Sequence, residues 1–217
     1  MNSPFLAALG TQADELLATG TPRRFAAGAF LIREGQTLSS ILLVKSGRVK
    51  ITTLSTEGRE AVLSISGPGE VLGELSALDE QPPSATVVAM EPVETIAVSV
   101  GAFRTFLTEH PAAMLAVLRT ITGRLREGDR KRMEFAVTDT LGRVCSRLVE
   151  LAHHHGVPHG DHVRITLPLS QEELAAWTGS SREAVAKSLR TLRERGYIET
   201  HRRSVTVINI GGLQKIR

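Results

Sequence analysis

Arg182, Glu183 and Lys187 have the side-chain types and the spacing that read base edges in DNA. They fall within the first two turns of a predicted helix, whose apolar residues Val185 and Leu189 recur at a helical interval. Arginine can donate to guanine O6 and N7, and glutamate can accept from cytosine N4. The segment therefore indicates contact with base pairs.

A second helix is predicted directly before this one. Ser170 and Glu173 have the spacing of a capping box, Thr178-Gly179 ends the helix, and Ser180-Ser181 opens the next. Two short helices joined by a glycine-containing turn form a helix-turn-helix, whose second helix can enter the major groove. A surface pair of helices with a solvated charged face is the alternative interpretation.

Two short β-branched segments, 197–200 and 205–208, follow these helices and predict a hairpin. Its turn carries Arg202 and Arg203, which are placed to touch phosphate, a contact that positions a protein without reading sequence. A hairpin in this place is a wing. Residues 163–167 alternate like a strand and can pair with the wing.

Composition limits the class of protein. The 217 residues allow one or two domains. Residues 138–217 hold 12 Lys and Arg against 8 Asp and Glu, whereas residues 1–137 hold 14 against 15. The basic surplus therefore lies with the predicted DNA-binding helices. We see no signal peptide and no apolar run of bilayer length, so we expect a cytoplasmic protein without membrane contact.

The titratable residues exclude several kinds of site. The single cysteine, Cys145, excludes an intramolecular disulfide and a cysteine-only iron–sulfur cluster within one chain. It lies in an apolar helical pattern, which indicates a buried structural thiol. The run His153-His154-His155 is interpreted as a solvated helix end, with a metal site as the alternative. No nucleophile and base stand at a sensible spacing, so we predict neither an enzyme nor a metal site.

Short apolar runs separated by glycine and proline turns fill residues 24–100, a pattern typical of a sandwich or barrel-like roll. The runs are 30–32, 41–44, 49–51, 61–65, 71–72, 86–88 and 95–98. At Gly73-Glu74-Leu75 about one helical turn interrupts them, and free backbone N–H groups at a helix start favour an anion. Glu74 can accept hydrogen bonds from sugar hydroxyls. A capped turn joining two strands is the alternative.

A long helix is predicted from Pro111 to about Val137. Its seam residues are spaced alternately by four and three, and such a heptad seam usually packs against a copy of itself. They are Met114, Leu118, Ile121, Leu125, Gly128, Arg132 and Phe135. We predict a homodimer, with a helix lying on its own domain as the alternative. Asp139 offers an N-cap for a following helix, so the domains are predicted as 1–137 and 138–217.

This order of parts resembles the Crp/Fnr family of bacterial regulators over essentially the whole chain. The motifs that carry the resemblance are Gly73-Glu74-Leu75, Ser180-Ser181-Arg182-Glu183, Leu31-Ile32-Arg33-Glu34-Gly35 and Ser46-Gly47. The resemblance implies an α+β protein with a cyclic-nucleotide-binding-type β-roll, a dimerisation helix at about 111–137 and a winged helix-turn-helix. It implies a homodimer on a two-fold site in double-stranded DNA, with an effector in each roll, and RNA polymerase as a partner if the protein activates transcription.

The resemblance also assigns roles to residues. Arg182 and Glu183 match the family's base-reading pair, and Lys187 stands where the cyclic-AMP receptor branch has Arg. The residues assigned to the DNA surface are Ser170, Gln171, Ser181, Arg182, Glu183, Lys187, Arg202 and Arg203, of which Ser170 and Gln171 match positions that touch phosphate. The residues assigned to the effector are Gly73, Glu74, Leu75, Ser84, Ala85, Gly128 and Asp129. Glu74 matches the carboxylate that binds ribose, and Ser84 the small residue beside the cyclic phosphate.

Three departures bear on the ligand. Pro83 stands where the cyclic-AMP branch has an Arg that neutralises the phosphate, and Gly128-Asp129 stand where it has the Thr-Ser pair that reaches adenine. We therefore expect a regulator gated by a cyclic nucleotide or another small anionic effector, but not by high-affinity cyclic AMP. A constitutive regulator with a degenerate pocket and a true cyclic-AMP-responsive regulator are the alternatives.

Overall fold

The computed structural model describes residues 5–56, 58–167, 170–201 and 204–216. Its contacts divide the chain into two compact units, Met1–Gly128 and Asp129–Arg217. The division falls inside the long helix α5 (Pro111–Val137), which ends where the sequence predicts. The last turns of α5 therefore belong to the second unit, together with the helices that follow.

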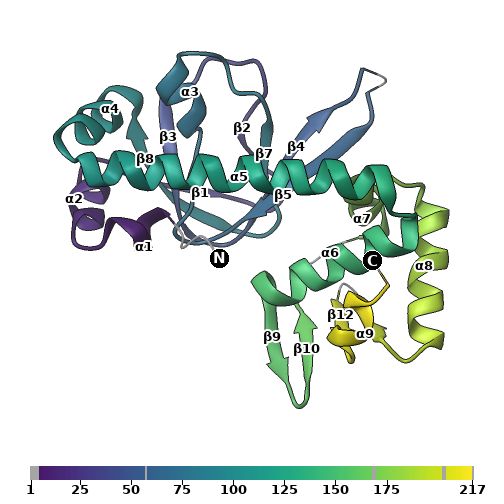
Figure 1. Cartoon of the computed structure of the whole chain (residues 1–217). Coiled ribbons are helices and arrows are strands. Elements are labelled where there is room, and N and C mark those ends of the chain that lie inside the picture. Colours follow the sequence, from purple (N-terminus) through teal and green to yellow (C-terminus); the bar gives the residue numbers. More distant parts are fainter. Residues whose placement is uncertain (1–4, 57, 168–169, 202–203, 217) are drawn as a thin grey trace. The chain divides into compact units, whose positions relative to one another are not determined.

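The first unit contains two four-stranded antiparallel sheets (Figure 1), with the orders β1-β8-β3-β6 and β2-β7-β4-β5. The strands are β1 Thr21–Phe25, β2 Phe30–Ile32, β3 Ser40–Ser46, β4 Val49–Leu54, β5 Glu60–Ser66, β6 Val71–Leu72, β7 Thr86–Ala89 and β8 Val93–Ser99. Each of the apolar runs predicted between residues 30 and 98 forms a strand, which confirms the β-roll. Strand β1 is not anticipated from the sequence.

Strand β3 shows why its apolar run is continuous. Leu42 and Val44 belong to a cluster shared by strands of both sheets, whereas Ile41 and Leu43 belong to a second cluster shared with helices. Because successive side chains of a strand point to opposite faces, a strand that is buried on both sides carries apolar residues at every position.

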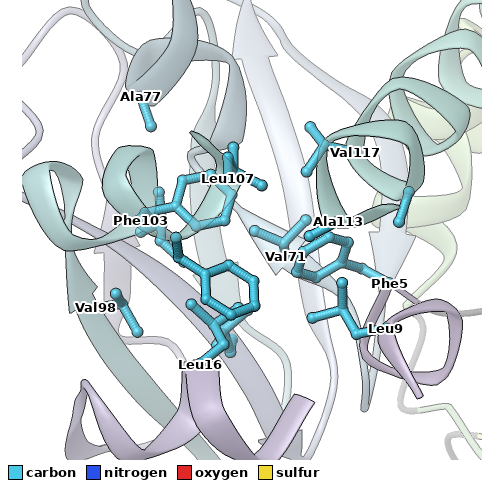
Figure 2. Packing of buried hydrophobic residues seen from close by; sticks show 14 of the residues in the cluster. Phe5, Leu9, Leu16, Val71, Ala77, Val98, Phe103, Leu107, Ala113 and Val117 are labelled. Atoms are coloured by element: carbon cyan, nitrogen blue, oxygen red, sulfur yellow. The ribbon is translucent and has the colours of Figure 1, made fainter. Parts of the chain in front are cut away.

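Helices cover the outer face of the sheet that contains β3 and β8. They are α1 (Phe5–Leu9), α2 (Gln12–Ala18), α4 (Val100–Glu109) and the first turns of α5. Figure 2 shows their packing, in which the rings of Phe5 and Phe103 meet edge to face at 6.3 Å. Ala113 and Ala116 give α5 a narrow buried face. Helix α4 is a further element that the sequence does not predict.

The second unit contains α6 (Thr140–His155), α7 (Gln171–Thr178), α8 (Arg182–Glu194) and α9 (Ile210–Gln214), with a sheet of order β11-β12-β10-β9. The strands are β9 Gly156–His159, β10 His162–Ile165, β11 Ile198–His201 and β12 Ser204–Val207. The predicted hairpin is confirmed as β11–β12, and β10 pairs with β12 as expected. The α+β class is thereby confirmed. Strand β9 and helix α9 are not anticipated.

The described residues contain neither a membrane-spanning helix nor a metal-binding cluster. No helix among them combines the length and apolar character needed to cross a membrane. Their His, Cys, Asp and Glu side chains form no group of three that can hold a metal ion. The run His153–His155 forms the last turn of α6.

Cys145 is fully buried in α6, which confirms its predicted structural place. Burial raises the pKa of its thiol to about 12, and the Asp139 carboxylate adds to the rise. Since only the thiolate is nucleophilic, we expect the native protein not to react with a disulfide reagent at pH 8. In guanidinium the same assay should titrate one thiol per chain. Rapid reaction of the native protein would contradict this assignment.

Candidate DNA-binding surface and effector site

Helices α7 and α8 form the predicted helix-turn-helix. The Ser170 hydroxyl accepts from the backbone N–H of Glu173 at 3.1 Å, and the Glu173 carboxylate accepts from that of Ser170 at 2.9 Å, which confirms the capping box. Gly179 ends α7 with φ +56°, and a side chain there would meet the Phe135 ring at 2.7 Å. Both observations require glycine in the turn. Ser181 caps α8 by accepting a backbone N–H of its first turn.

Helix α8 has one buried and one exposed face. Its buried residues are Val185, Ser188, Leu189 and Leu192. The exposed face carries Arg182, Glu183 and Lys187. Hydrogen bonds from its own backbone N–H and from Ser181 lower the pKa of the Glu183 carboxyl, and Arg182 adds to the effect. Glu183 is therefore ionised at neutral pH and acts only as an acceptor, the form that pairs with cytosine N4.

The other residues assigned to the DNA surface lie at helix starts or, in the sequence, between the two strands of the wing. Ser170 and Gln171 are exposed at the start of α7, and Ser181 is exposed at the start of α8. Helix N-termini favour negative charge, so both positions suit a phosphate. Arg202 and Arg203 lie outside the described residues, between the ends of β11 and β12.

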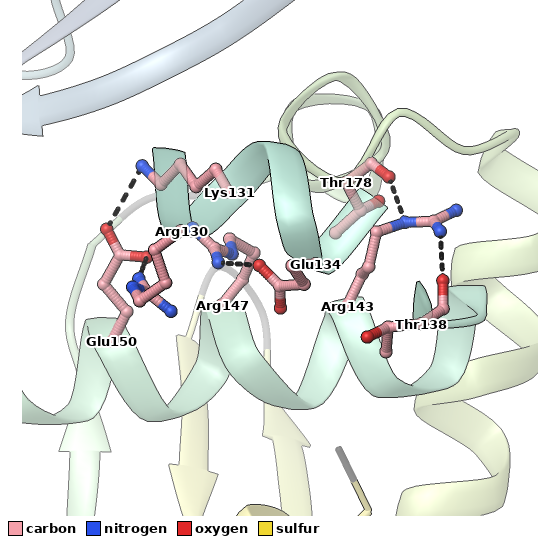
Figure 3. Close-up of polar contacts among 8 residues, drawn as sticks. All are labelled: Arg130, Lys131, Glu134, Thr138, Arg143, Arg147, Glu150 and Thr178. Atoms are coloured by element: carbon pink, nitrogen blue, oxygen red, sulfur yellow. Dashed lines mark hydrogen bonds and ion pairs between the residues drawn. The ribbon is translucent and has the colours of Figure 1, made fainter. Parts of the chain in front are cut away.

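Arg143 of α6 holds the turn between α7 and α8, a role that the sequence does not reveal. Its guanidinium donates to the backbone carbonyls of Thr178 at 2.8 Å and Thr138 at 2.5 Å (Figure 3), and to Ser180 Oγ at 3.3 Å. It also lies 5.2 Å from the centre of the Phe135 ring. The end of α5 is thereby joined to the turn. The role is missed from the sequence because Thr178 lies 35 positions away.

In the first unit, Gly73 and Glu74 begin the short helix α3 (Glu74–Asp79). Gly73 has φ +85°, and a side chain there would meet Leu38 at 2.8 Å. Glu74 is 2% exposed, and its carboxylate forms an ion pair with Arg124 of α5. Arg124 also donates to the Val71 carbonyl at 3.0 Å. The carboxylate assigned to ribose is therefore already bound by a guanidinium.

Glu70 adds a second carboxylate beside the same guanidinium, 3.6 Å from Arg124 Nη2. Burial raises the pKa of Glu70; Arg124 opposes this shift and Glu74 adds to it. The cluster thus sets one guanidinium against two carboxylates, so an added negative charge is disfavoured there. Arg124 is a second residue that sequence reasoning missed, because its partner Glu74 lies 50 positions away.

The residues before β7 differ in exposure. Ser84 is exposed and Ala85 is half-buried, whereas Pro83 is buried and its carbonyl accepts from the backbone N–H of Gly35 at 2.9 Å. Leu75, assigned to the effector from the other motif, is 43% exposed. The side chain of Pro83 carries no charge. A phosphate bound here would therefore need a cation from another residue.

The remaining assigned residues lie along α5. Gly128 and Asp129 stand at the division between the two units, where Asp129 pairs with Arg132 at 3.1 Å on the helix surface. Of the seam residues, Met114 and Ile121 pack partly against the core of the first unit, whereas Leu118 and Leu125 are exposed. Phe135 lies beside Gly179 and Arg143, within the second unit.

Two family models match the chain. A cyclic nucleotide-binding domain matches residues 22–110, and a Crp-like helix-turn-helix domain matches residues 142–216. The CRP-like cAMP-activated global transcriptional regulator of Mycobacterium tuberculosis is 33% identical over 186 residues, which cover 86% of this chain and 83% of that relative. The chain belongs to the Crp/Fnr family. As a Crp/Fnr member it is a DNA-binding transcription regulator with a cyclic nucleotide-binding domain, and the family is not one of enzymes.

Other members of the family and solved structures match most of this chain. The Cyclic AMP receptor protein of Thermus thermophilus is 28% identical over 215 residues, covering 99% of this chain and 96% of that relative. A CooA mutant from Carboxydothermus hydrogenoformans superposes with a TM-score of 0.80 at 22% identity, covering 99% and 96% of the two chains. The c-di-GMP responsive regulator CLP of Xanthomonas campestris superposes with a TM-score of 0.79 at 23% identity, covering 89% of this chain and 96% of that chain. These two structures show the shared fold.

Proposed function

We propose that this protein binds a two-fold symmetric DNA site as a homodimer and that a small effector in the β-roll gates this binding. The observation that carries the proposal is the two-faced α8, which buries one side and presents Arg182, Glu183 and Lys187 on the other. Exposed cations and an ionised acceptor on one helix face supply donors for guanine and an acceptor for cytosine. RNA polymerase is a further partner if the protein activates transcription.

The homodimer rests on the exposed side of α5. Leu115, Leu118 and Leu125 are 53%, 46% and 58% exposed. The seven-residue spacing of Leu118 and Leu125 places them on one stripe, as in helices that pair in parallel. Ala113 and Ala116 are buried on another side of α5. The helix therefore packs on its own domain along one face and keeps a second face for the partner copy.

We propose that the effector is a small molecule and that the site does not bind cyclic AMP with high affinity. Pro83 cannot supply the guanidinium that a cyclic phosphate needs, and Arg124 is already bound by Glu74 and lies beside Glu70. The missing charge-assisted contact is worth about 1.5–3 kcal/mol. High affinity for cyclic AMP would therefore require other contacts to replace it.

The named relatives favour cyclic AMP as a second candidate. The Mycobacterium tuberculosis relative is cAMP-activated and the Thermus thermophilus relative is a cyclic AMP receptor, whereas CLP responds to c-di-GMP. One fold thus serves different ligands, and the residues of the individual site decide between them.

The first test of the function separates base reading from phosphate contact. Arg182→Ala should weaken binding to the specific site by about 1–3 kcal/mol per half-site and relax discrimination at one base pair. Arg202→Ala should weaken specific and random DNA alike and flatten the salt dependence of the affinity, because it removes a phosphate contact. Fluorescence anisotropy at several salt concentrations measures both. Equal losses on specific and random DNA for the two variants would contradict these roles.

A second test concerns the dimer. Leu125→Glu would set like charges across the two copies of α5, so it should give monomers that bind the full site much more weakly. Val157→Glu, at a 46% exposed apolar position on β9, is the control and should stay dimeric. Light scattering measures the mass of each variant. An intact Leu125→Glu dimer would remove α5 as the interface.

A third test concerns the ligand. Calorimetry with the unmodified protein should give a cyclic AMP dissociation constant weaker than the low micromolar range. Pro83→Arg should strengthen cyclic AMP binding by restoring a charged partner for the phosphate, and should leave the binding of adenosine, which lacks the phosphate, unchanged. A constant in the low micromolar range or tighter for the unmodified protein would instead support the cyclic-AMP-responsive candidate.

A further inference from the structure

An ionic cluster around the buried Arg147 joins the last turns of α5 to α6 (Figure 3). Arg147 of α6, with a side chain 3% exposed, lies 2.5 Å from Glu134 of α5 and 2.5 Å from Glu150 of its own helix. Glu150 is in turn 3.6 Å from Lys131 Nζ and 4.0 Å from Arg130 Nη2, both on α5. The cluster lies wholly within the second unit and crosses between its two helices at several points.

The same cluster reaches the first helix of the helix-turn-helix. Trp177 of α7 is 3% exposed. The Lys131 ammonium lies 5.6 Å and the Arg147 guanidinium 5.9 Å from the centre of its ring. Cations at this distance are attracted by the ring, so α5, α6 and α7 meet around one side chain. Arg143, one turn before Arg147 on α6, makes the parallel link to the turn that follows α7.

Stability alone does not explain this cluster. A buried ion pair gains little over apolar side chains of similar volume, because both charges must leave water. Among the described residues, Glu134 Oε1 and Trp177 Nε1 are also buried without a hydrogen-bond partner, which is a further cost. A guanidinium fork, by contrast, fixes direction, since its donors lie in one plane and match carboxylates at set angles.

We propose that Arg147 is a positioning residue for DNA recognition. Through Glu134 and Trp177 it fixes the angle at which α5 enters the DNA-binding unit. In a dimer joined along α5, this angle sets the separation and relative rotation of the two α8 helices, and therefore the half-site spacing that the protein accepts. The inference rests on the proposed function, a homodimer on a two-fold DNA site.

The experiment compares the affinities of the protein for four DNA duplexes. Three carry the same two half-sites, at the preferred spacing and with two base pairs added or removed between them. The fourth carries a single half-site. Each added base pair turns one half-site by about 35° relative to the other, so a dimer with fixed heads should discriminate strongly. The variants are Arg147→Lys, which keeps the charge without the fork, and Glu134→Leu with Arg147→Met, which leaves no unpaired charge at their contact. Arg132→Met is the control, because it removes a surface ion pair of α5.

We expect the wild type and Arg132→Met to share one strong spacing preference. The double variant should lower the ratio of affinities between preferred and altered spacings by about tenfold, with Arg147→Lys in between, while the affinity for the single half-site stays within about threefold. Its melting temperature should remain close to that of the wild type, since apolar replacement of a buried pair is often neutral. The emission of Trp177, the single tryptophan, should change in both Arg147 variants.

Two results would overturn the inference while leaving the proposed function intact. The double variant could keep the full spacing preference, or it could lose affinity equally for every duplex, including the single half-site, as a general loss of structure would cause. A wild-type protein that binds all spacings and the single half-site equally would overturn both this inference and the dimeric reading of DNA.

Discussion

Helix α5 makes three different kinds of contact along its length. These contacts decide which of its faces are buried and which stay exposed. Its first turns bury small residues, Ala113 and Ala116, against the roll. Its middle supplies Arg124 to Glu74. Its last turns supply Glu134 to the DNA-binding unit. Because side chains three and four apart share a helix face, these contacts occupy part of the circumference and leave the leucines at 118 and 125 exposed.

Arg124 in the first unit and the buried Arg147 in the second form the ion pairs that hold α5. Arg124 and Arg147 each face two carboxylates, and each joins α5 to another element. Removing one member of such a cluster leaves an unpaired buried charge, which is costlier than replacing the whole cluster. A substitution at a single position of either cluster should therefore destabilise the protein more than replacement of the whole cluster. Arg143 differs in that it donates to backbone carbonyls, and among the described residues it has no carboxylate partner.

Local signals made much of this molecule predictable. Continuous apolar runs give the strands, and the spacing from Ser170 to Glu173 gives the start of α7, because each depends on residues close in sequence. Strand β1 escapes prediction because its sequence, Thr-Pro-Arg-Arg-Phe, has no apolar alternation and is held by backbone pairing with β8. The roles of three arginines are not predicted, for a related reason. Their partners lie 50, 35 and 13 positions away for Arg124, Arg143 and Arg147, and nothing local shows that a guanidinium turns inward.

The ion pair of Glu74 and Arg124 also bears on how an effector would act. A ligand changes an equilibrium only through contacts that differ between two states. On the proposed function, a ligand that hydrogen-bonds to Glu74 must share that carboxylate with Arg124, and Arg124 belongs to α5. Any such ligand therefore changes a contact of α5 directly. A neutral hydroxyl can share the carboxylate without displacing the guanidinium, whereas an anion adds to the charge of Glu70 and Glu74. The local charge therefore favours hydroxyl recognition at Glu74 and leaves the anionic part of an effector to be bound elsewhere.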